Sequence, residues 1–553
     1  MLKPHISASL KRLQPYQFLL PLAALIAVLP LILYGPSCGH DFDFHRLNWL
    51  EAAVQFRHGN LHPQWTFSPA WNAGEPRFTF YPPLSWTLGG LLSLFAPAYW
   101  TPALYTWIAL TASGLTMHRL ARSFAPPTAS LLAATFYLAN PYMLFTAYER
   151  TAYAELLAAA WIPLLFDAIL RKQLTVPRIA VPIALLWLTN APAAVMGCYA
   201  FALLAAIRIA QFFHTQQPKR IAATTAAGTL LGLGLSSVYL LPAAYERRYV
   251  QIAMAVIPGL RIQDNTLFHH TGDPDRDAVI HAASLLASLL LALTALALLQ
   301  LQRTRREAPR SRQLLLPLIT LATAVAFLLT PLSLPLWQHL PELAFLQFPW
   351  RILALLTAVL SLTLACAFFP NLSLSPRKLS LAALALTAAL TIPAWFAFHQ
   401  ACDAPLPQLP SILQSHQGIE PTDEYTPLEA DNDALAHTNP PYWLSPNPQA
   451  PAPTGNKPGP TPLRLQLTAP TPQFLILNLR DYPAWNVTLN HTPLSAHEQR
   501  DDGLIAIAIP QGPINLTVHW RALPDHTLGL LLSLLSAALL LALLRPRSVM
   551  IKP

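Results

Sequence analysis

Charged residues are scarce in this chain of 553 residues, at 11%, whereas a soluble domain carries about 25%. Hydrophobic residues make up 54% of the chain, and its mean hydropathy is +0.38. Many apolar runs approach the about 20 residues that an α-helix needs to cross a bilayer. The shortage of charge therefore excludes an ordinary soluble enzyme and predicts a polytopic α-helical membrane protein.

Cysteine is also rare. The four cysteines are too few for a disulfide framework, and no spacing between them resembles a zinc site. Cys198 and Cys366 lie in apolar runs, so we expect them to be buried. Cys38 and Cys402 both fall on the predicted outer side of the membrane, where they either form a disulfide in an oxidising compartment or remain two free thiols.

Basic residues outnumber acidic ones, 35 to 26, which gives a formal net charge of +9. In a soluble protein this excess would suggest a nucleic-acid partner. Here the basic residues gather in short loops between apolar runs, as the positive-inside rule describes. We therefore expect the lipid bilayer as partner and no nucleic acid. Residues 1–33 have a basic start and an apolar core without a convincing cleavage site, which predicts an uncleaved first helix.

The basic loops also order the spans. If each basic loop faces the cytoplasm, both termini do too, and about 12–13 helices cross the membrane. The predicted spans cover residues 16–34, 100–118, 126–139, 154–170, 177–189, 193–212, 220–241, 279–300, 313–332, 350–369, 379–398 and 527–545. Residues 81–97 are apolar, but a span there would place every later basic loop outside. We interpret them as an interfacial or re-entrant helix, with a true span as the alternative.

This order of spans predicts three regions. Residues 1–398 form a membrane domain whose first outer loop covers residues 35–99. Residues 399–526 form an outer domain, with a Pro-rich start followed by short alternating apolar runs that predict a small β-sandwich. Residues 527–553 supply the last transmembrane helix and a cytoplasmic tail.

The first outer loop contains an acidic stretch directly after the first apolar run. Asp41 and Asp43 lie there between His40 and His45. Ionisable groups at the edge of a membrane usually line a water-filled cavity and indicate a functional site. The two carboxylates would either act as general base on an acceptor hydroxyl or hold a divalent cation such as Mg²⁺ or Mn²⁺. The structural alternative is a polar loop that caps the next helix, with Asp43 as N-cap.

Other polar residues near predicted outer helix ends are candidates for substrate binding. Arginines there would suit a lipid-linked phosphate, because the guanidinium binds phosphate oxygens in pairs. Simpler alternatives are an internal Glu75–Arg77 pair, an Arg150–Glu155 pair, and headgroup contacts for Arg247. The predicted substrate-binding residues are His40, His45, Glu75, Arg77, Tyr81, Glu149, Arg150, Glu155, Arg247 and Arg351.

Several short motifs resemble those of a known family. They are Gly39-His40-Asp41, Gly74-Glu75-Pro76-Arg77-Phe78, Phe80-Tyr81-Pro82-Pro83-Leu84-Ser85, Ala154-Glu155-Leu156, Phe348-Pro349-Trp350-Arg351, Asp423-Glu424-Tyr425-Thr426-Pro427 and Tyr482-Pro483-Ala484-Trp485. With one span before a long outer loop, the chain resembles the GT-C superfamily of membrane glycosyltransferases. Within that superfamily it is most similar to the YfhO-like bacterial membrane proteins, some of which are labelled 6-pyruvoyl-tetrahydropterin synthase-related.

The resemblance implies a catalytic role for the first outer loop. An aspartate of this loop serves GT-C enzymes as base or metal ligand, and Asp41 matches that position best, followed by Asp43. The implied donor is a sugar on polyprenyl phosphate, used at the outer face of a bacterial cytoplasmic (inner) membrane, and a glycan or lipid is the acceptor.

We therefore predict transfer of a sugar from polyprenyl phosphate to an envelope glycan or lipid. One alternative is a transporter or flippase of a lipid-linked glycan, which would use the same cavity and arginines. The other is a non-catalytic envelope-assembly protein whose β domain binds glycan or protein.

Overall fold

The computed structural model describes residues 18–213, 217–304, 309–368, 372, 374–403, 408–494 and 497–545. Their fold has two compact units. Unit 1 comprises the described residues of Met1–Arg46, Tyr99–Leu233 and Pro258–Cys402, and unit 2 those of Leu47–Ala98, Gly234–Ile257 and Asp403–Pro553. The predicted division after residues 398 and 526 stays a prediction. The predicted cytoplasmic ends lie mostly outside the described residues.

Unit 1 is helical. Its α-helices are α2 (Leu19–Tyr34), α6 (Thr101–Ala121), α7 (Pro127–Ala139), α8 (Pro141–Tyr148), α9 (Tyr153–Ala158), α10 (Ile162–Leu170), α11 (Val176–Thr189), α12 (Ala191–Gln211), α15 (Pro274–Thr304), α16 (Pro309–Leu328), α17 (Leu334–His339), α18 (Leu353–Ala367) and α19 (Pro376–Phe398). Its 3₁₀ turns are η4 (Ile262–Asn265), η5 (Pro331–Ser333), η6 (Ala344–Leu346) and η7 (Pro349–Ile352). Helices α3 (Phe42–Arg57) and α13 (Pro218–Leu235) begin in unit 1 and continue into unit 2.

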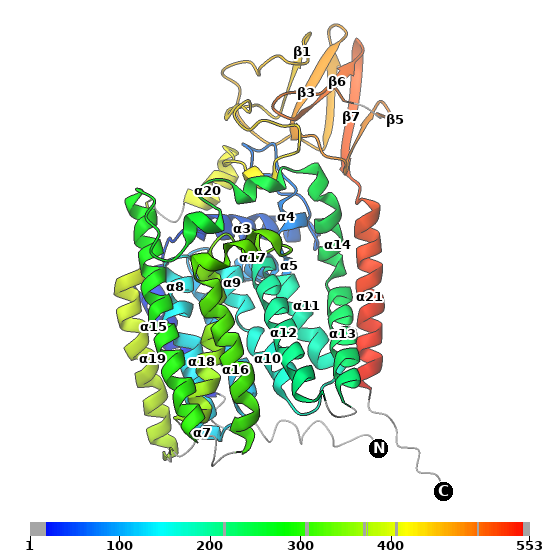
Figure 1. The fold of residues 1–553 in the computed structure, drawn as a ribbon. Helices are drawn as coiled ribbons and strands as arrows, with labels where there is room; N and C mark the ends of the chain where they lie inside the picture. The colour runs from blue at the N-terminus through cyan, green and yellow to red at the C-terminus, as the bar shows by residue number, and fades with distance from the viewer. Residues whose placement is uncertain are drawn as a thin grey trace, which may run out of the picture. The chain divides into compact units, whose positions relative to one another are not determined.

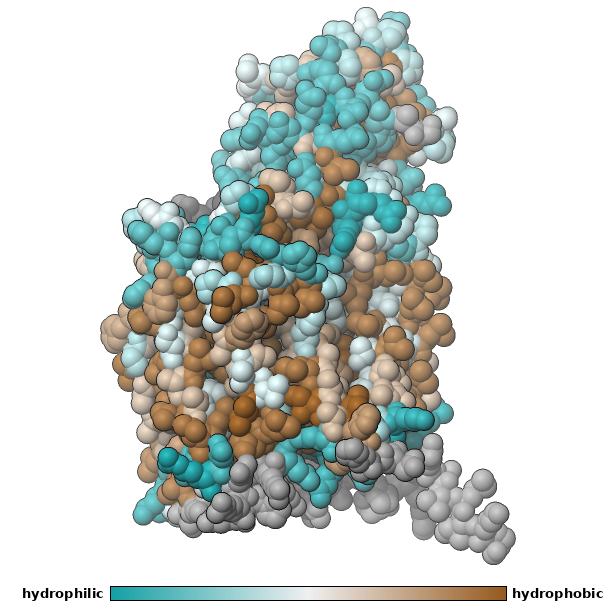
Figure 2. Space-filling model, viewed as in Figure 1, coloured by the Kyte–Doolittle hydropathy of each residue, from teal (hydrophilic) through white to brown (hydrophobic). Residues whose placement is uncertain are grey.

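Burial in unit 1 follows the expectation for a helix bundle in lipid. Helix α18 is buried along almost its whole length, and α15 and α16 lie beside it (Figure 1). On α15 a row of leucines is exposed, namely Leu285, Leu289, Leu293 and Leu296. Their spacing of three or four residues places them on one helix face, and Figure 2 shows apolar outer surfaces on the helices of this unit. Such a face needs lipid rather than water around it.

Unit 2 combines a few helices with two β-sheets. The helices are α4 (Arg77–Phe80), α5 (Pro83–Phe95), α14 (Ser237–Glu246), α20 (Gln408–Ser415) and α21 (Pro524–Leu544), with 3₁₀ turns η2 (Arg247–Tyr249), η3 (Ile252–Val256) and η8 (Asp423–Tyr425). The strands are β1 (Tyr442–Ser445), β2 (Arg464–Ala469), β3 (Gln473–Arg480), β4 (Trp485–Leu489), β5 (Thr492–Pro493), β6 (Leu504–Ile509) and β7 (Gly512–Trp520).

The strands confirm the predicted β region near the C-terminus, and its outer location stays a prediction. One sheet has the order β1-β3-β6 and the other β2-β7-β4-β5, and every pairing is antiparallel. Apolar residues that alternate along the strands are buried, such as Leu475, Leu477, Ile507, Leu516 and Val518. The alternating apolar runs of the sequence coincide with β2, β3, β4, β6 and β7, whereas the short strands β1 and β5 lack such a run. These runs are Leu463–Leu467, Phe474–Leu479, Trp485–Leu489, Leu504–Ile509 and Ile514–Trp520.

The helical membrane class is confirmed, with fewer long spans than predicted. Six described helical segments are long and apolar enough to cross a membrane, or eight if each of two bent pairs counts as one span. The predicted count is higher because it includes shorter helices such as α2, α7 and α11, with 16, 13 and 14 residues. Since a helix rises 1.5 Å per residue, these fall short of a hydrocarbon core of about 30 Å.

Helix α5 lies in the ambiguous segment of residues 81–97. It has 13 residues and begins at Pro83, so its length of about 20 Å is too short for a span. A Cβ at Gly89 would lie 2.1 Å from the Trp49 ring, so a larger residue does not fit between α5 and α3. The structure therefore favours the interfacial or re-entrant interpretation.

Candidate active site

The loop between α2 and α3 carries the acidic stretch, and its position depends on a glycine. The backbone amides of His40 and Asp41 donate to the carbonyls of Glu149 (3.3 Å) and Arg150 (2.9 Å). A Cβ on Gly39 would lie 1.9 Å from the Glu149 carbonyl oxygen, so only glycine permits this approach. The Gly39-His40-Asp41 motif is thereby fixed against the chain segment that holds Arg150.

These contacts place Asp41 in a polar cluster with Arg150 and Glu155. Asp41 is the more exposed of its two carboxylates. Its side chain is 33% exposed, and its Oδ1 lies 3.2 Å from His40 Nδ1. Burial alone would raise the pKa of Asp41, but the His40 hydrogen bond and the Arg150 charge outweigh it and hold the pKa below its usual value. The same hydrogen bond raises the pKa of His40. Asp41 is therefore ionised at neutral pH and open to a ligand.

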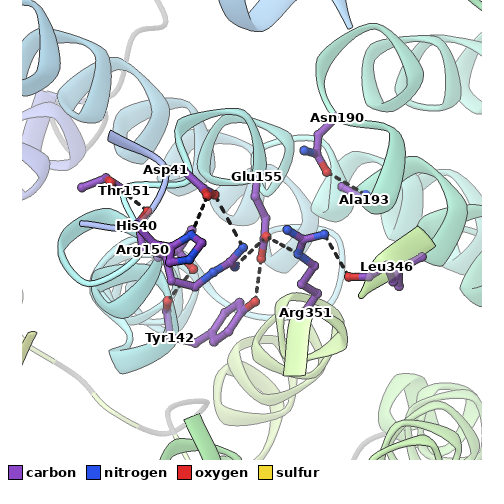
Figure 3. A network of polar contacts seen from close by, with 11 residues as sticks. His40, Asp41, Tyr142, Arg150, Thr151, Glu155, Asn190, Ala193, Leu346 and Arg351 are labelled. Carbon is purple, nitrogen blue, oxygen red and sulfur yellow. Dashed lines mark hydrogen bonds and ion pairs between the residues drawn. The ribbon is translucent and has the colours of Figure 1, made fainter. Parts of the chain in front are cut away.

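Two arginines share one buried glutamate next to Asp41 (Figure 3). Arg150 Nη1 donates to Glu155 Oε2 at 2.7 Å, and Arg351 Nε lies 3.4 Å from the same oxygen. Tyr142 donates to Glu155 Oε1 at 2.6 Å. Arg150 Nη2 also lies 4.0 Å from Asp41 Oδ2. One carboxylate thus faces two guanidinium groups, and the second carboxylate beside them is only partly buried.

The segments that carry the arginines have unusual backbone conformations. Thr151 follows Arg150 with φ 47°, and Gln347 precedes the Phe348-Pro349-Trp350-Arg351 motif with φ 62°. Non-glycine residues in such regions cost about 1–3 kcal/mol each and tend to cluster at functional sites. Both therefore mark the segments that position the guanidinium groups.

A second set of contacts anchors the loop from the other side. Cys38 and Cys402 form a disulfide, so the structure selects the paired alternative. The Gln400 amide donates to both oxygens of Glu149 at 2.8 Å. Burial raises the pKa of Glu149, although the Gln400 hydrogen bond opposes this shift. Glu149 therefore supports the loop, and its carboxylate faces Gln400.

Of the other two cysteines, Cys366 is buried as expected, and Cys198 is only partly buried.

The remaining residues of the acidic stretch, Asp43 and His45, belong to helix α3. His45 is buried in α3 with its ring edge-on to Tyr153 at 5.5 Å. Burial lowers the pKa of His45 to about 4, so this imidazole is neutral. Asp43 lies exposed in the first turn of α3, one residue inside the helix, and therefore does not occupy the N-cap position of the structural alternative.

Four predicted binding residues belong to unit 2. Glu75 Oε1 and Arg77 Nε form a fully buried ion pair at 2.6 Å, which favours the simpler alternative for this pair. The Tyr81 carbonyl accepts from the Trp86 indole at 3.1 Å. Arg247 is exposed in η2. A substrate role for these four residues stays a prediction.

The predicted metal ligands do not fit a cation well. Asp41 is already bonded to His40 and faces Arg150, and a guanidinium group competes with a metal for the same oxygen. Among the described residues, Asp41 and Asp43 are not part of a converging group of three metal-ligating side chains. A requirement for Mg²⁺ or Mn²⁺ stays a prediction.

The sequence prediction missed Tyr142, Gln400 and Ser37. Asn140 caps α8 by accepting from the Tyr142 and Met143 amides at 3.1 and 3.2 Å, and Pro141 follows it. An Asn-Pro pair that opens a helix is a readable signal for the start of α8, where Tyr142 lies. The backbone amide of Gln400 donates to the Ser37 hydroxyl oxygen at 2.8 Å, and the sequence gives no signal for this contact.

The apolar helices and this polar cluster define a multi-pass helical membrane protein. No family model matches the chain, and no curated protein matches it. Solved structures of the arabinofuranosyltransferase AftD from Mycobacteria show a weak likeness. One has 16% identity and a TM-score of 0.42, and the match covers 70% of this chain and 27% of AftD. A mutant form has 15% identity and a TM-score of 0.38, covering 92% of this chain and 42% of the mutant chain.

This chain therefore spans less than half the length of these AftD structures. The proposal below rests on the site residues of this chain.

Proposed function

We propose that this protein transfers a sugar from a polyprenyl-phosphate carrier to an envelope glycan or lipid, as a GT-C-type glycosyltransferase. It would work at the outer face of the bacterial cytoplasmic membrane. The observation that carries the proposal is the shared glutamate: two guanidinium groups bind one carboxylate, directly beside a second, partly exposed carboxylate. The two guanidinium groups suit the phosphate of the donor, and the partly exposed carboxylate suits the acceptor hydroxyl.

Asp41 is the proposed base. As the acceptor oxygen forms its bond to the anomeric carbon of the sugar, the hydroxyl proton passes to the Asp41 carboxylate. The bond from this carbon to the phosphate oxygen breaks, and its electron pair leaves with polyprenyl phosphate. His40 keeps Asp41 ionised and oriented through the 3.2 Å contact. A positioned base contributes about 10²–10⁴-fold to a rate.

Arg150 and Arg351 are the proposed phosphate ligands. Negative charge develops on the phosphate as the glycosidic bond breaks, so preorganised cations stabilise the transition state more than the ground state. Glu155 and Tyr142 hold Arg150 in place. Arg351 is further aligned by its Nη1 bond to the Leu346 carbonyl (2.9 Å) and by the Phe348 ring, 5.0 Å below its guanidinium carbon.

The resemblance of the sequence motifs supports the choice of donor. It associates an aspartate of the first outer loop with sugar transfer from polyprenyl phosphate, and Asp41 occupies that place in the chain. Membership of the YfhO-like branch remains part of this proposal.

The test is transfer in proteoliposomes. Purified protein is supplied with polyprenyl-phosphate sugars labelled in the sugar, with and without candidate acceptors, and both bond cleavage and donor movement across the bilayer are measured. We expect cleavage by wild type and a loss of about 10²-fold or more in Asp41→Asn. Asp43→Asn in the same assay separates the two predicted bases, and we expect it to retain transfer.

Two results would contradict the proposal. Donor movement without cleavage would identify a flippase. Normal transfer by a well-folded Asp41→Asn protein would exclude Asp41 as the base.

A further inference from the structure

Unit 2 contains a second buried polar group, unrelated to the residues above. Glu246 ends α14, and Asp525 and His526 lie in the first turn of α21. His526 Nε2 lies 2.6 Å from Glu246 Oε1 and 4.0 Å from Asp525 Oδ2. The three side chains are 0%, 6% and 8% exposed for Glu246, Asp525 and His526. Three potential ligand atoms thus converge within 4.8 Å of one another inside the protein.

Not all of these polar atoms are paired. Both carboxylate oxygens of Asp525 are buried without a hydrogen-bond partner among the described residues, whereas Glu246 Oε1 and His526 Nε2 face each other at 2.6 Å. Among the described residues, His526 is the basic side chain that lies within 4.0 Å of both the Glu246 and the Asp525 carboxylates. Burying charge without compensation is costly. Two carboxylates and one imidazole therefore leave a deficit of positive charge.

Helix polarity adds to this deficit. The C-terminal end of a helix carries partial negative charge, which disfavours a carboxylate there. Glu246 is the last residue of α14 and is fully buried. Asp525 by contrast sits at the favourable N-terminal end of α21. Helix polarity alone therefore favours Asp525 at its position and disfavours Glu246.

Neighbouring side chains hold this group in position. The Tyr482 hydroxyl donates to Glu246 Oε2 at 2.5 Å, and Trp520 Nε1 donates to Gln64 Oε1 at 2.5 Å. Because an indole nitrogen only donates, it fixes the Gln64 amide, whose Nε2 faces His526 Nδ1 at 3.0 Å. Such outer contacts orient the ligands of metal sites. In the metal-free state they place the imidazole proton on Nε2, next to Glu246.

We propose that Glu246, Asp525 and His526 bind a divalent first-row transition metal, for which Zn²⁺ is the probe. Carboxylate oxygens and imidazole nitrogens are both ligands of such ions, and three protein ligands leave a position open for water. The separations of 2.6 and 4.0 Å bracket the about 3.3 Å expected between neighbouring ligands of tetrahedral zinc with bonds of about 2.0–2.1 Å. Metal binding at Nε2 requires the imidazole proton to move to Nδ1 and the Gln64 side chain to turn, so that its Oε1 accepts from Nδ1 and no longer from Trp520 Nε1.

The metal would have a structural role and would stabilise the contact between α14 and α21. Helix α21 packs on α14 through small residues, since a Cβ on Gly529 would meet the Ser237 carbonyl at 2.5 Å and the Val238 backbone amide donates to the Ser533 hydroxyl at 2.8 Å. Most of the rest of α21 is exposed. A metal shared by Glu246 and the first turn of α21 ties the two helices at the point where the chain leaves β7.

The experiment uses the full chain purified in detergent. Its zinc content is measured by mass spectrometry, and thermal unfolding is followed after chelation and after Zn²⁺ is added back. We expect stoichiometric zinc, a lower unfolding temperature with chelator, and recovery on addition of zinc. Asp525→Asn should abolish stoichiometric zinc, and Tyr482→Phe should weaken zinc binding about 10–100-fold.

Asp502→Asn is the matched control. Asp502 is another buried carboxylate of unit 2, but Arg500 pairs with it at 2.6 Å, so this variant should lose stability and retain zinc. Unchanged zinc content in Asp525→Asn would overturn the proposal. So would a wild type that binds no added zinc and is stabilised by Asp525→Asn, because the carboxylates would then share a proton. None of these readouts depends on sugar transfer.

Discussion

Two arginine–carboxylate groups in this protein look alike in sequence and differ in structure. In unit 2, Glu75 and Arg77 form a one-to-one pair whose other contacts are also internal: Arg77 donates to Asn48 Oδ1 (3.1 Å) and Thr422 Oγ1 (2.6 Å), and Glu75 Oε2 accepts from the Thr422 amide (3.0 Å). In unit 1, one glutamate serves two arginines beside the partly exposed Asp41.

The difference lies in charge balance and exposure. A buried pair with matched charges and internal hydrogen bonds is a structural element, because a substrate would have to displace those bonds. In the other group one glutamate is shared by two guanidinium groups, and the second carboxylate beside them, Asp41, is 33% exposed, so a ligand has access to the cluster at Asp41. The comparison predicts that changes in the first group affect stability, whereas changes in the second affect turnover.

The largest effect is expected for Arg77→Leu. It leaves Glu75 buried without its partner, which typically costs about 3–5 kcal/mol. Thermal or denaturant unfolding in detergent measures the loss. Transfer per folded molecule should change little, and a large fall in turnover without a loss of stability would place Arg77 with the substrate.

The disulfide should come next. The double variant Cys38→Ser/Cys402→Ser removes the link that anchors the Asp41 loop, at a typical cost of about 2–4 kcal/mol. Unfolding temperatures with and without reductant measure this effect. The wild type should respond to reductant and the variant should not. An equal response of both proteins would mean that the two thiols are not paired.

Arg351→Lys should have a smaller effect, on turnover. A lysine cannot bind Glu155 and a phosphate through a planar fork, so we expect kcat/KM for the donor to fall about tenfold, or about 1.4 kcal/mol. Arg464→Lys, on exposed strand β2, is the control and should match wild type. If Arg351→Lys loses stability and keeps its turnover, Arg351 is structural, like Arg77.

The smallest effect is expected from pH. The raised pKa of His40 contributes stability that is full below its usual value of 6.5 and is lost as the pH rises through the raised value. Since its side chain is 75% exposed, the contribution is small. Unfolding temperature against pH should decline slightly less on the alkaline side for His40→Gln than for wild type. Parallel curves would contradict the His40–Asp41 interaction.

Much of the architecture was readable from the sequence, because composition and periodicity are local properties. Scarce charge and long apolar runs determined a helical membrane protein, and alternating apolar residues located five strands. The acidic stretch after the first helix, with Arg150, Glu155 and Arg351, was identified because ionisable residues near a bilayer are costly unless they have a role.

Only the tertiary structure decided which of these residues meet. Arg351 lies about two hundred positions from Glu155, and Gln400 and Cys402 reach the Asp41 loop from still further along the chain. Glu75 and Arg77 carried the same sequence signal as Arg150 and Glu155, yet they are matched and enclosed. Charge balance, exposure and the convergence of Glu246 with Asp525 and His526 depend on how distant segments pack, and a local pattern contains no record of that packing.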